Sequence, residues 1–154
     1  GRVFTAAISN ATRCVIGGGS YEDVLDYVTI ATLGDAADFG DLITPRAYSG
    51  SVFSLTRGVW AGGSSPSMVS VIETINIASI GNAAAFGNLT GSRSLGVNGV
   101  SDLTRGVFCG GYQGGYTNIM EYITIDAAGT SNTALDFGNL SGNRGEMLGA
   151  LSGA

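Results

Sequence analysis

The chain repeats one phrase three times: a Thr-Arg pair opens a short β-prone run that closes on paired glycines. The copies read TRCVIGGG, TRGVWAGG and TRGVFCGG. Their arginines, Arg13, Arg57 and Arg105, are 44 and 48 residues apart. A repeat of this length indicates one supersecondary unit copied several times, and each copy buries its apolar face against a neighbour. The sequence is therefore best analysed as a series of equivalent units.

Every unit has the same order of segments. It begins with an arginine and a small, apolar run, passes through the Thr-Arg phrase and a loop, and enters a run such as LDYVTIA, IETINIA or MEYITID. That run alternates β-branched or aromatic residues with polar ones, which is typical of a half-buried strand. A glycine-containing turn then leads to Phe-Gly-Asx-Leu, and four residues later the next unit begins. The unit-opening arginines are Arg2, Arg46, Arg93 and Arg144.

Each unit predicts three clear strands and a short fourth strand that ends at the phenylalanine. Four antiparallel strands in ~45 to 50 residues is the size of one propeller blade. No segment is predicted to be helical, because the alanine-rich stretches are short and bounded by glycine. We expect a single all-β repeat domain over 1–154, with blades at 2–45, 46–92 and 93–143, and with 144–154 as the first strand of a further blade.

The composition excludes several classes of protein. With 44% apolar and only 12% charged residues, the chain is too apolar to be disordered, and its 26 glycines suit short strands joined by turns. A net charge of −5 without a basic cluster argues against a nucleic-acid partner. No apolar run approaches the ~20 residues of a membrane helix, so we expect no membrane insertion.

The chain contains neither lysine nor histidine, so the commonest general base and the commonest metal ligand are both missing. We therefore expect no catalytic residues, no metal and no cofactor. Asp35, Asp38 and Asp41 form the one tight acidic cluster. We interpret this cluster as a solvated turn. The alternative is a carboxylate pair for glycoside cleavage.

All seven arginines occupy two slots of the repeat, which predicts an architectural role. A guanidinium offers five donors in a rigid fork and can tie strand-end carbonyls or a carboxylate. Asp26, Glu73 and Glu121 recur at matching positions, so we expect a buried arginine–carboxylate pair in every unit. Arginines gathered around a pore to bind an anion are the functional alternative. The arginines to which we assign the structural role are Arg13, Arg57, Arg105, Arg46, Arg93 and Arg144.

The paired glycines have a structural interpretation as well. Gly62 and Gly63, like Gly110 and Gly111, permit positive φ and close approach where sheets crowd together. The Asx residues at 41, 88 and 139 are expected to cap turns, with a calcium site as the weaker alternative. Cys14 and Cys109 are expected to be buried free thiols.

The loop that follows the paired glycines varies most between units. In the third unit it carries Tyr112, Gln113, Tyr116 and Asn118, whose rings and amides suit sugars and protein surfaces. These four residues form the predicted ligand-binding site, because loops on a rigid scaffold commonly carry binding. The alternative is a polar hairpin without a partner.

The order of arginine, hydrophobic strand, Gly-Gly strand, Glu-Tyr strand and aromatic resembles the kelch motif over essentially the whole chain. Phenylalanine stands where kelch repeats carry tryptophan, and Tyr122 directly follows Glu121. A closer resemblance is to the glycine-rich, kelch-like arrays of tailed-bacteriophage structural proteins, which share the TRGVF-x-GG and YITI phrases. The resemblance implies a kelch-like β-propeller segment of three four-stranded antiparallel blades.

Three blades do not close a ring, since propellers have ~4 to 8. More chain or oligomerisation would have to complete it, and other virion proteins or copies of the chain itself are the expected partners.

The resemblance further implies a non-enzymatic virion component (a decoration, tail or fibre protein) whose loops contact the virion or a host-surface glycan or protein. A cellular or secreted kelch-type interaction module, with an extracellular location, is the alternative. A non-catalytic part of a carbohydrate-active protein is the third.

Overall fold

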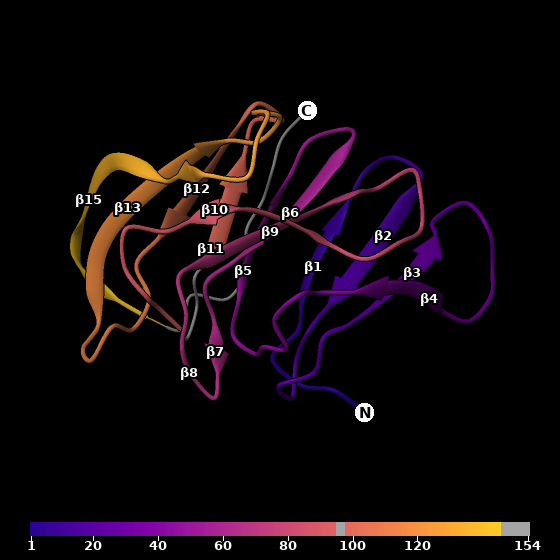
Figure 1. The fold of residues 1–154 in the computed structure, drawn as a ribbon, viewed down its shortest axis with the longest axis horizontal. Coiled ribbons are helices and arrows are strands. Elements are labelled where there is room, and N and C mark those ends of the chain that lie inside the picture. The colour runs from indigo at the N-terminus through magenta and orange to yellow at the C-terminus, as the bar shows by residue number, and fades with distance from the viewer. Residues whose placement is uncertain (95–97, 146–154) are drawn as a thin grey trace.

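The structure is a computed structural model that describes residues 1–94 and 98–145. These residues form fifteen strands and no helix, which confirms the all-β prediction, and no helix capable of crossing a membrane occurs among them. Three sheets follow one another along the chain, and a small two-stranded hairpin projects from the middle of the molecule (Figure 1).

Each sheet is built mainly from one unit of the repeat. The first sheet has the order β1 (Ala6–Ser9), β2 (Arg13–Gly17), β3 (Val24–Thr29) and β4 (Ala37–Asp41). The second has the order β14 (Asn132–Thr133), β10 (Ala84–Asn88), β9 (Val71–Asn76), β6 (Arg57–Ala61) and β5 (Gly50–Phe53). The third has the order β11 (Asn98–Ser101), β12 (Arg105–Cys109), β13 (Thr117–Thr124) and β15 (Leu135–Arg144). The hairpin pairs β7 (Ser64–Ser65) with β8 (Ser67–Met68).

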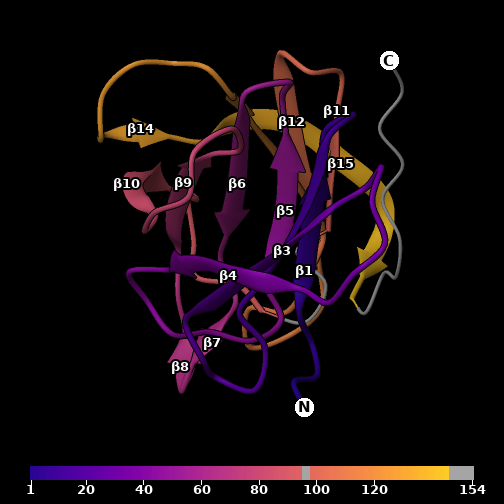
Figure 2. The ribbon, with the colours of Figure 1, turned by 90° about the vertical axis from the view of Figure 1, so that its right-hand side faces the viewer.

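The first strands of the three sheets lie next to one another (Figure 2). The Ser51 hydroxyl on β5 donates a hydrogen bond to the Ala7 carbonyl on β1 at 2.9 Å. On the other side of β5, a Cβ on Gly99 of β11 would lie 2.4 Å from the Ser51 carbonyl oxygen. The strands approach so closely here that a side chain at Gly99 would clash with β5.

Two apolar cores lie between consecutive sheets. The first core joins the first two sheets: Ile8, Val15, Leu25, Phe39 and Leu42 from one, and Trp60, Ile75, Ile77 and Ala83 from the other. The second core repeats the arrangement between the second and third sheets: Val52, Val59, Ala61, Ile72, Phe86 and Leu89 against Phe108, Ile123, Ile125 and Ala134. We call the side of a sheet that faces the following sheet its far face, and the opposite side its near face.

The fourth strands differ from the prediction. They do not end at the phenylalanine but continue through it, and a register shift in the pairing of each fourth strand with its neighbour lies near the Phe-Gly step. The second sheet gains β14 from the third unit, paired in parallel with β10. The loop of the second unit forms the β7–β8 hairpin, which the sequence did not predict. Of the segment 144–154 only Arg144, at the end of β15, and Gly145 lie within the described residues.

Candidate functional site

The unit-opening arginines each reach a carboxylate on the third strand of their sheet. The ion pairs are Arg2–Asp26, Arg46–Glu73 and Arg93–Glu121. Every unit thus has the predicted pair, but the pair is buried only in the second and third units. Arg46 and Arg93 are buried with their partners, whereas the Asp26 side chain is 35% exposed.

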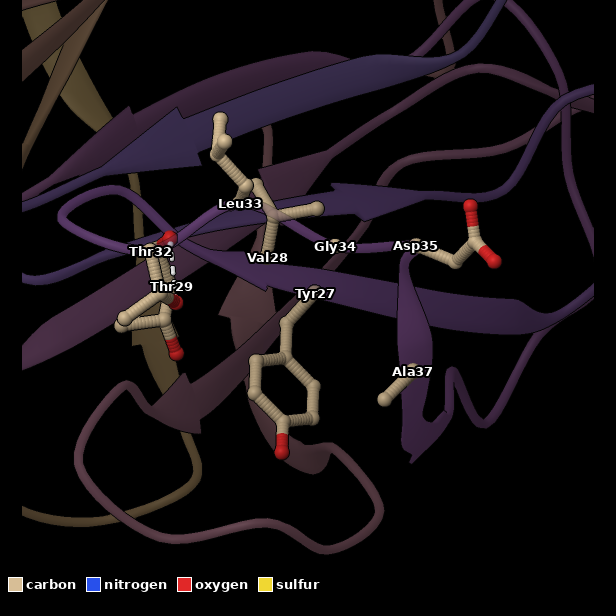
Figure 3. Close-up of a pocket in the computed structure, with 8 residues that line it drawn as sticks. All are labelled: Tyr27, Val28, Thr29, Thr32, Leu33, Gly34, Asp35 and Ala37. Atoms are coloured by element: carbon tan, nitrogen blue, oxygen red, sulfur yellow. Dashed lines mark hydrogen bonds between the residues drawn. The ribbon is translucent and has the colours of Figure 1, made fainter.

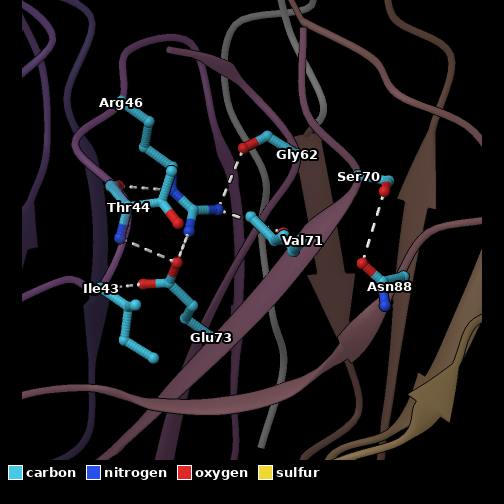
Figure 4. Close-up of polar contacts among 8 residues, drawn as sticks. All are labelled: Ile43, Thr44, Arg46, Gly62, Ser70, Val71, Glu73 and Asn88. Atoms are coloured by element: carbon cyan, nitrogen blue, oxygen red, sulfur yellow. Dashed lines mark hydrogen bonds and ion pairs between the residues drawn. The ribbon is translucent and has the colours of Figure 1, made fainter.

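The Arg46–Glu73 cluster shows how one such pair organises its surroundings (Figure 4). The Arg46 guanidinium also donates to the carbonyls of Gly62 and Val71, both at 3.1 Å. The Glu73 carboxylate in turn accepts the backbone N–H groups of Ile43 and Thr44, at 2.8 and 3.1 Å. Burial lowers the pKa of Arg46, and Glu73 partly offsets that shift. Both charged groups therefore bond to the surrounding backbone, and they fix the segment around Ile43 and Thr44 that connects the first two sheets.

The second glycine of each pair donates its N–H to the carbonyl of the arginine that opens the next unit. These bonds run from Gly19 to Arg46 at 2.8 Å, from Gly63 to Arg93 at 2.7 Å, and from Gly111 to Arg144 at 2.9 Å. The three glycines have φ values of 90°, 101° and 105°. Since L side chains rarely adopt this conformation, glycine is needed for the bond to form. One arginine therefore binds one sheet through its backbone and the next through its side chain.

The arginines of the Thr-Arg phrase bind the other predicted kind of acceptor, which is the carbonyl at a strand end. Arg13 donates to the Ile77 carbonyl at 3.0 Å, and Arg57 donates to the carbonyls of Ile125 and Ala127 at 2.9 and 2.8 Å. All three bonds cross from one sheet to the next. The Arg105 guanidinium lies over the Tyr122 ring at 4.7 Å, and no side-chain hydrogen bond of Arg105 to the described residues is present.

The Arg93–Glu121 cluster is less complete than its counterpart. Nε and Nη1 of Arg93 are buried without a hydrogen-bond partner among the described residues. Glu121 accepts the N–H and the hydroxyl of Thr90 in addition to Arg93. Burial raises the pKa of Glu121, and the charge of Arg93 counteracts the shift.

The predicted ligand-binding residues come together only in part. The rings of Tyr112 and Tyr116 meet edge to face at 5.7 Å, and Gln113 lies at the exposed tip of the same loop. Asn118 lies in β13 instead, where its amide donates to the Leu140 carbonyl at 3.3 Å. Tyr116 is 48% exposed and packs over Gly145, because a Cβ at Gly145 would fall 2.2 Å from the ring. A pair of tyrosines, of which Tyr116 is exposed and Tyr112 half-buried, remains as the candidate contact.

Two shallow hollows lie beneath the turn between the third and fourth strands. One, of about 140 Å³ in the first sheet, is bordered by Tyr27, Thr29, Leu33 and Asp35 (Figure 3). The other, of about 130 Å³ in the third sheet, lies at equivalent positions around Tyr122, Thr124 and Leu135. In the first hollow Asp35 is the one carboxylate among the lining residues. Among the residues that the structure describes, no group of three potential metal ligands gathers.

Two further predictions change. The Asx residues do not cap turns: Asp41, Asn88 and Asn139 lie in β4, β10 and β15. Cys14 and Cys109 are free, as predicted, but half-buried, and burial raises the pKa of both thiols.

A turn residue that was not predicted from the sequence recurs before each Thr-Arg phrase. The side-chain oxygens of Asn10, Ser54 and Asp102 each accept two backbone N–H groups, those of the residues two and three positions later. The signal was a short polar residue three positions before the arginine, and such residues favour these turns. These bonds lower the pKa of Asp102.

Comparison of the sequence with protein families and with curated proteins finds no relative. No protein-family model matches the sequence, and no curated protein shows significant similarity to it. The function is therefore inferred from the geometry and from the phrases of the repeat.

Proposed function

We propose that the three sheets are blades of a kelch-like β-propeller segment and that the protein is a non-enzymatic scaffold that displays loops. The observation that carries this proposal is the arginine that opens each unit. We call it an arginine staple where it links two sheets, one through its backbone carbonyl and the other through its side chain. In each unit the arginine engages a carboxylate of its own sheet, and the arginines that open the second and third units also accept an N–H from the preceding sheet. The neighbouring first strands support a common axis, because propeller blades meet through their innermost strands.

The more particular proposal is a structural or adhesion component of a phage virion, in a decoration, tail or fibre protein. Its support is the likeness of the TRGVF-x-GG and YITI phrases to phage arrays. The loops after the paired glycines leave the three sheets at equivalent positions, and they differ in sequence, whereas every unit keeps an arginine–carboxylate pair. A rigid frame with variable loops suits contacts with a host surface or with other virion proteins. Mass spectrometry of the source particle is expected to find this chain among the virion proteins, and its absence there would contradict the virion assignment.

The display role can be tested at the tyrosine pair. We expect the wild-type protein to bind members of a glycan or host-surface panel and Tyr116→Ala to lose at least ~10-fold in affinity, since exposed aromatic anchors carry much of such binding. Tyr21→Ala is the matched control, because Tyr21 is an exposed tyrosine in the corresponding loop of the first unit. Equal binding by all three proteins, or binding by none, would contradict a role for this loop.

A further inference from the structure

The far face of the third sheet carries residues equivalent to those of the other two far faces. None of the described residues covers it, however. Phe39 and Phe86, at the same position of the first and second sheets, are 2% and 0% exposed. Their counterpart Phe137 is 47% exposed, and Val100, the counterpart of Ile8 and Val52, is 42% exposed. The pattern that builds both cores is thus present a third time on an open surface.

The first sheet has the complementary surface, an uncovered near face. Ile77 and Ile125, which complete the two cores, are both 0% exposed, whereas their counterpart Ile30 is 54% exposed. Ile16 and Val28, the counterparts of Trp60 and Ile75, are half-buried, and Ala36, the counterpart of Ala83, is exposed. One end of the molecule therefore carries half of a core, and the other end carries the other half.

We propose that the far face of the third sheet binds the near face of the first sheet of a second copy of this chain. The occupant follows from the repeat, because each of the two internal cores is formed by these same two kinds of face. Such a contact is head-to-tail, so it generates a ring where the rotation closes and an open array where it does not. The inference rests on the proposed scaffold function in treating the sheets as interchangeable units.

Polar groups at the two ends match as well. Arg13 and Arg57 each donate to the carbonyl of the isoleucine at one position of the following sheet, Ile77 or Ile125. Arg105 is exposed, and in the head-to-tail contact its acceptor is the Ile30 carbonyl of the second copy. A positively charged donor at an uncovered apolar face thus meets a carbonyl that lies at the required position.

The outer edge of the third sheet has the same complementarity. In the first sheet, the carbonyls of Phe39 and Asp41 accept N–H groups of Gly81 and Ala83 from the following sheet, both at 2.7 Å. In the second sheet, the Asn88 carbonyl accepts the N–H of Ala134 at 2.8 Å. The corresponding carbonyls, those of Phe137 and Asn139, receive no donor from a further sheet in the part of the chain that is described. The N–H groups of Gly34 and Ala36 in a second copy occupy the donor positions.

One residue departs from the pattern. Cys14 stands where the second and third sheets have Gly58 and Gly106, and a Cβ at those glycines would come within 2.9 Å of Ile8 and 2.5 Å of Val52. In the head-to-tail contact Cys14 faces Val100, so the thiol must be accommodated by a local shift. Replacing Cys14 with glycine is therefore expected to tighten the association about threefold or more.

The test measures self-association of the full chain by sedimentation velocity over a wide range of concentration. We expect wild type to associate, and Phe137→Asp and Ile30→Asp each to weaken association at least ~30-fold, because each buries a charge in the contact. Leu55→Asp is the control, since Leu55 is exposed in the turn between β5 and β6 of the middle sheet and belongs to neither end face. Leu135→Asp, at another exposed position beside Tyr122, replaces Phe137→Asp if that variant fails to fold.

Mixing the two variants decides the geometry. Phe137→Asp keeps an intact first-sheet face, and Ile30→Asp keeps an intact third-sheet face, so the mixture is expected to form a one-to-one dimer that neither variant forms alone. A monomeric wild type would overturn the proposal, and so would variants that affect association unequally, since that result indicates pairing of like faces. Neither of these two results would contradict the loop-display function, because the Tyr116→Ala binding experiment tests that function separately.

Discussion

The Arg46–Glu73 and Arg2–Asp26 clusters occupy the same slot of the repeat in different surroundings. Glu73 lies under the segment that arrives from the first sheet and accepts two of its N–H groups. Asp26 has no preceding sheet in the described structure and accepts only Arg2. The difference shows that a repeated sequence specifies the pair itself, while the neighbouring unit determines how deeply the pair is buried. Burial in turn determines what the pair contributes to stability.

The largest expected effect separates these two clusters. Glu73→Gln leaves the buried Arg46 charge without its counter-ion, so it is expected to lower the free energy of unfolding by ~3–5 kcal/mol. Asp26→Asn, at a half-buried pair that solvent reaches, is expected to cost ~1 kcal/mol or less, because solvent screens that interaction. Urea denaturation of both variants measures the difference. Losses of equal size would show that burial does not distinguish the clusters.

The second comparison sets Arg57 against Arg105. Arg57→Ala removes two bonds to carbonyls of the third sheet and a contact with the Phe86 ring, so we expect a loss of ~2–3 kcal/mol. Arg105→Ala removes an exposed cation over a tyrosine and is expected to change monomer stability by no more than ~1 kcal/mol. The measurement is thermal unfolding at protein concentrations low enough to keep the chain monomeric. A loss for Arg105→Ala as large as that for Arg57→Ala would contradict the assignment of Arg57 as a link between sheets.

The smallest effect concerns the turn residues Asp102 and Asn10. The native pKa of Asp102 lies below its ordinary value of 3.8, because the N–H groups of Thr104 and Arg105 bond to the charged form. Its stabilisation is therefore fully present above pH ~4 and is lost as the pH falls through the lower native pKa. Asp102→Asn is expected to remove this pH dependence.

The control for that experiment is Asn10→Ala, at the equivalent turn of the first unit, where the acceptor does not titrate. It is expected to lower stability by the same amount at every pH. Chemical denaturation between pH 2 and pH 7 follows both variants. A pH-dependent loss in Asn10→Ala would assign the effect to some other group.

Much of the fold could be predicted because the repeat aligns equivalent residues. The third strand of each unit, the positive φ of Gly63 and the arginine–carboxylate pairs all follow from residue types that only one local environment suits. The extension of β15 to ten residues could not be predicted, and neither could the addition of β14 to the second sheet. Both depend on which sheet edges are unpaired, and that is a property of the assembled chain.

The candidate site was predicted less well than the frame. Tyr112 and Tyr116 were placed together correctly, because only three residues of a tight loop lie between them. Asn118 was assigned to the loop although it belongs to β13, because a polar residue at a strand entrance has the composition of a turn. The exposure of Phe137 was also beyond sequence analysis, because its phrase is the same as that of the buried Phe86.

A double-mutant cycle on Arg46 and Glu73 shows whether the buried arginine holds neighbouring sheets together through its carboxylate partner. Unfolding free energies are measured for wild type, Arg46→Met, Glu73→Gln and the double variant. A staple predicts a coupling energy of ~2–3 kcal/mol, with the double variant more stable than the sum of the single losses implies. Additive losses, with a coupling below ~0.5 kcal/mol, would show that the two residues stabilise the fold independently and would contradict the account.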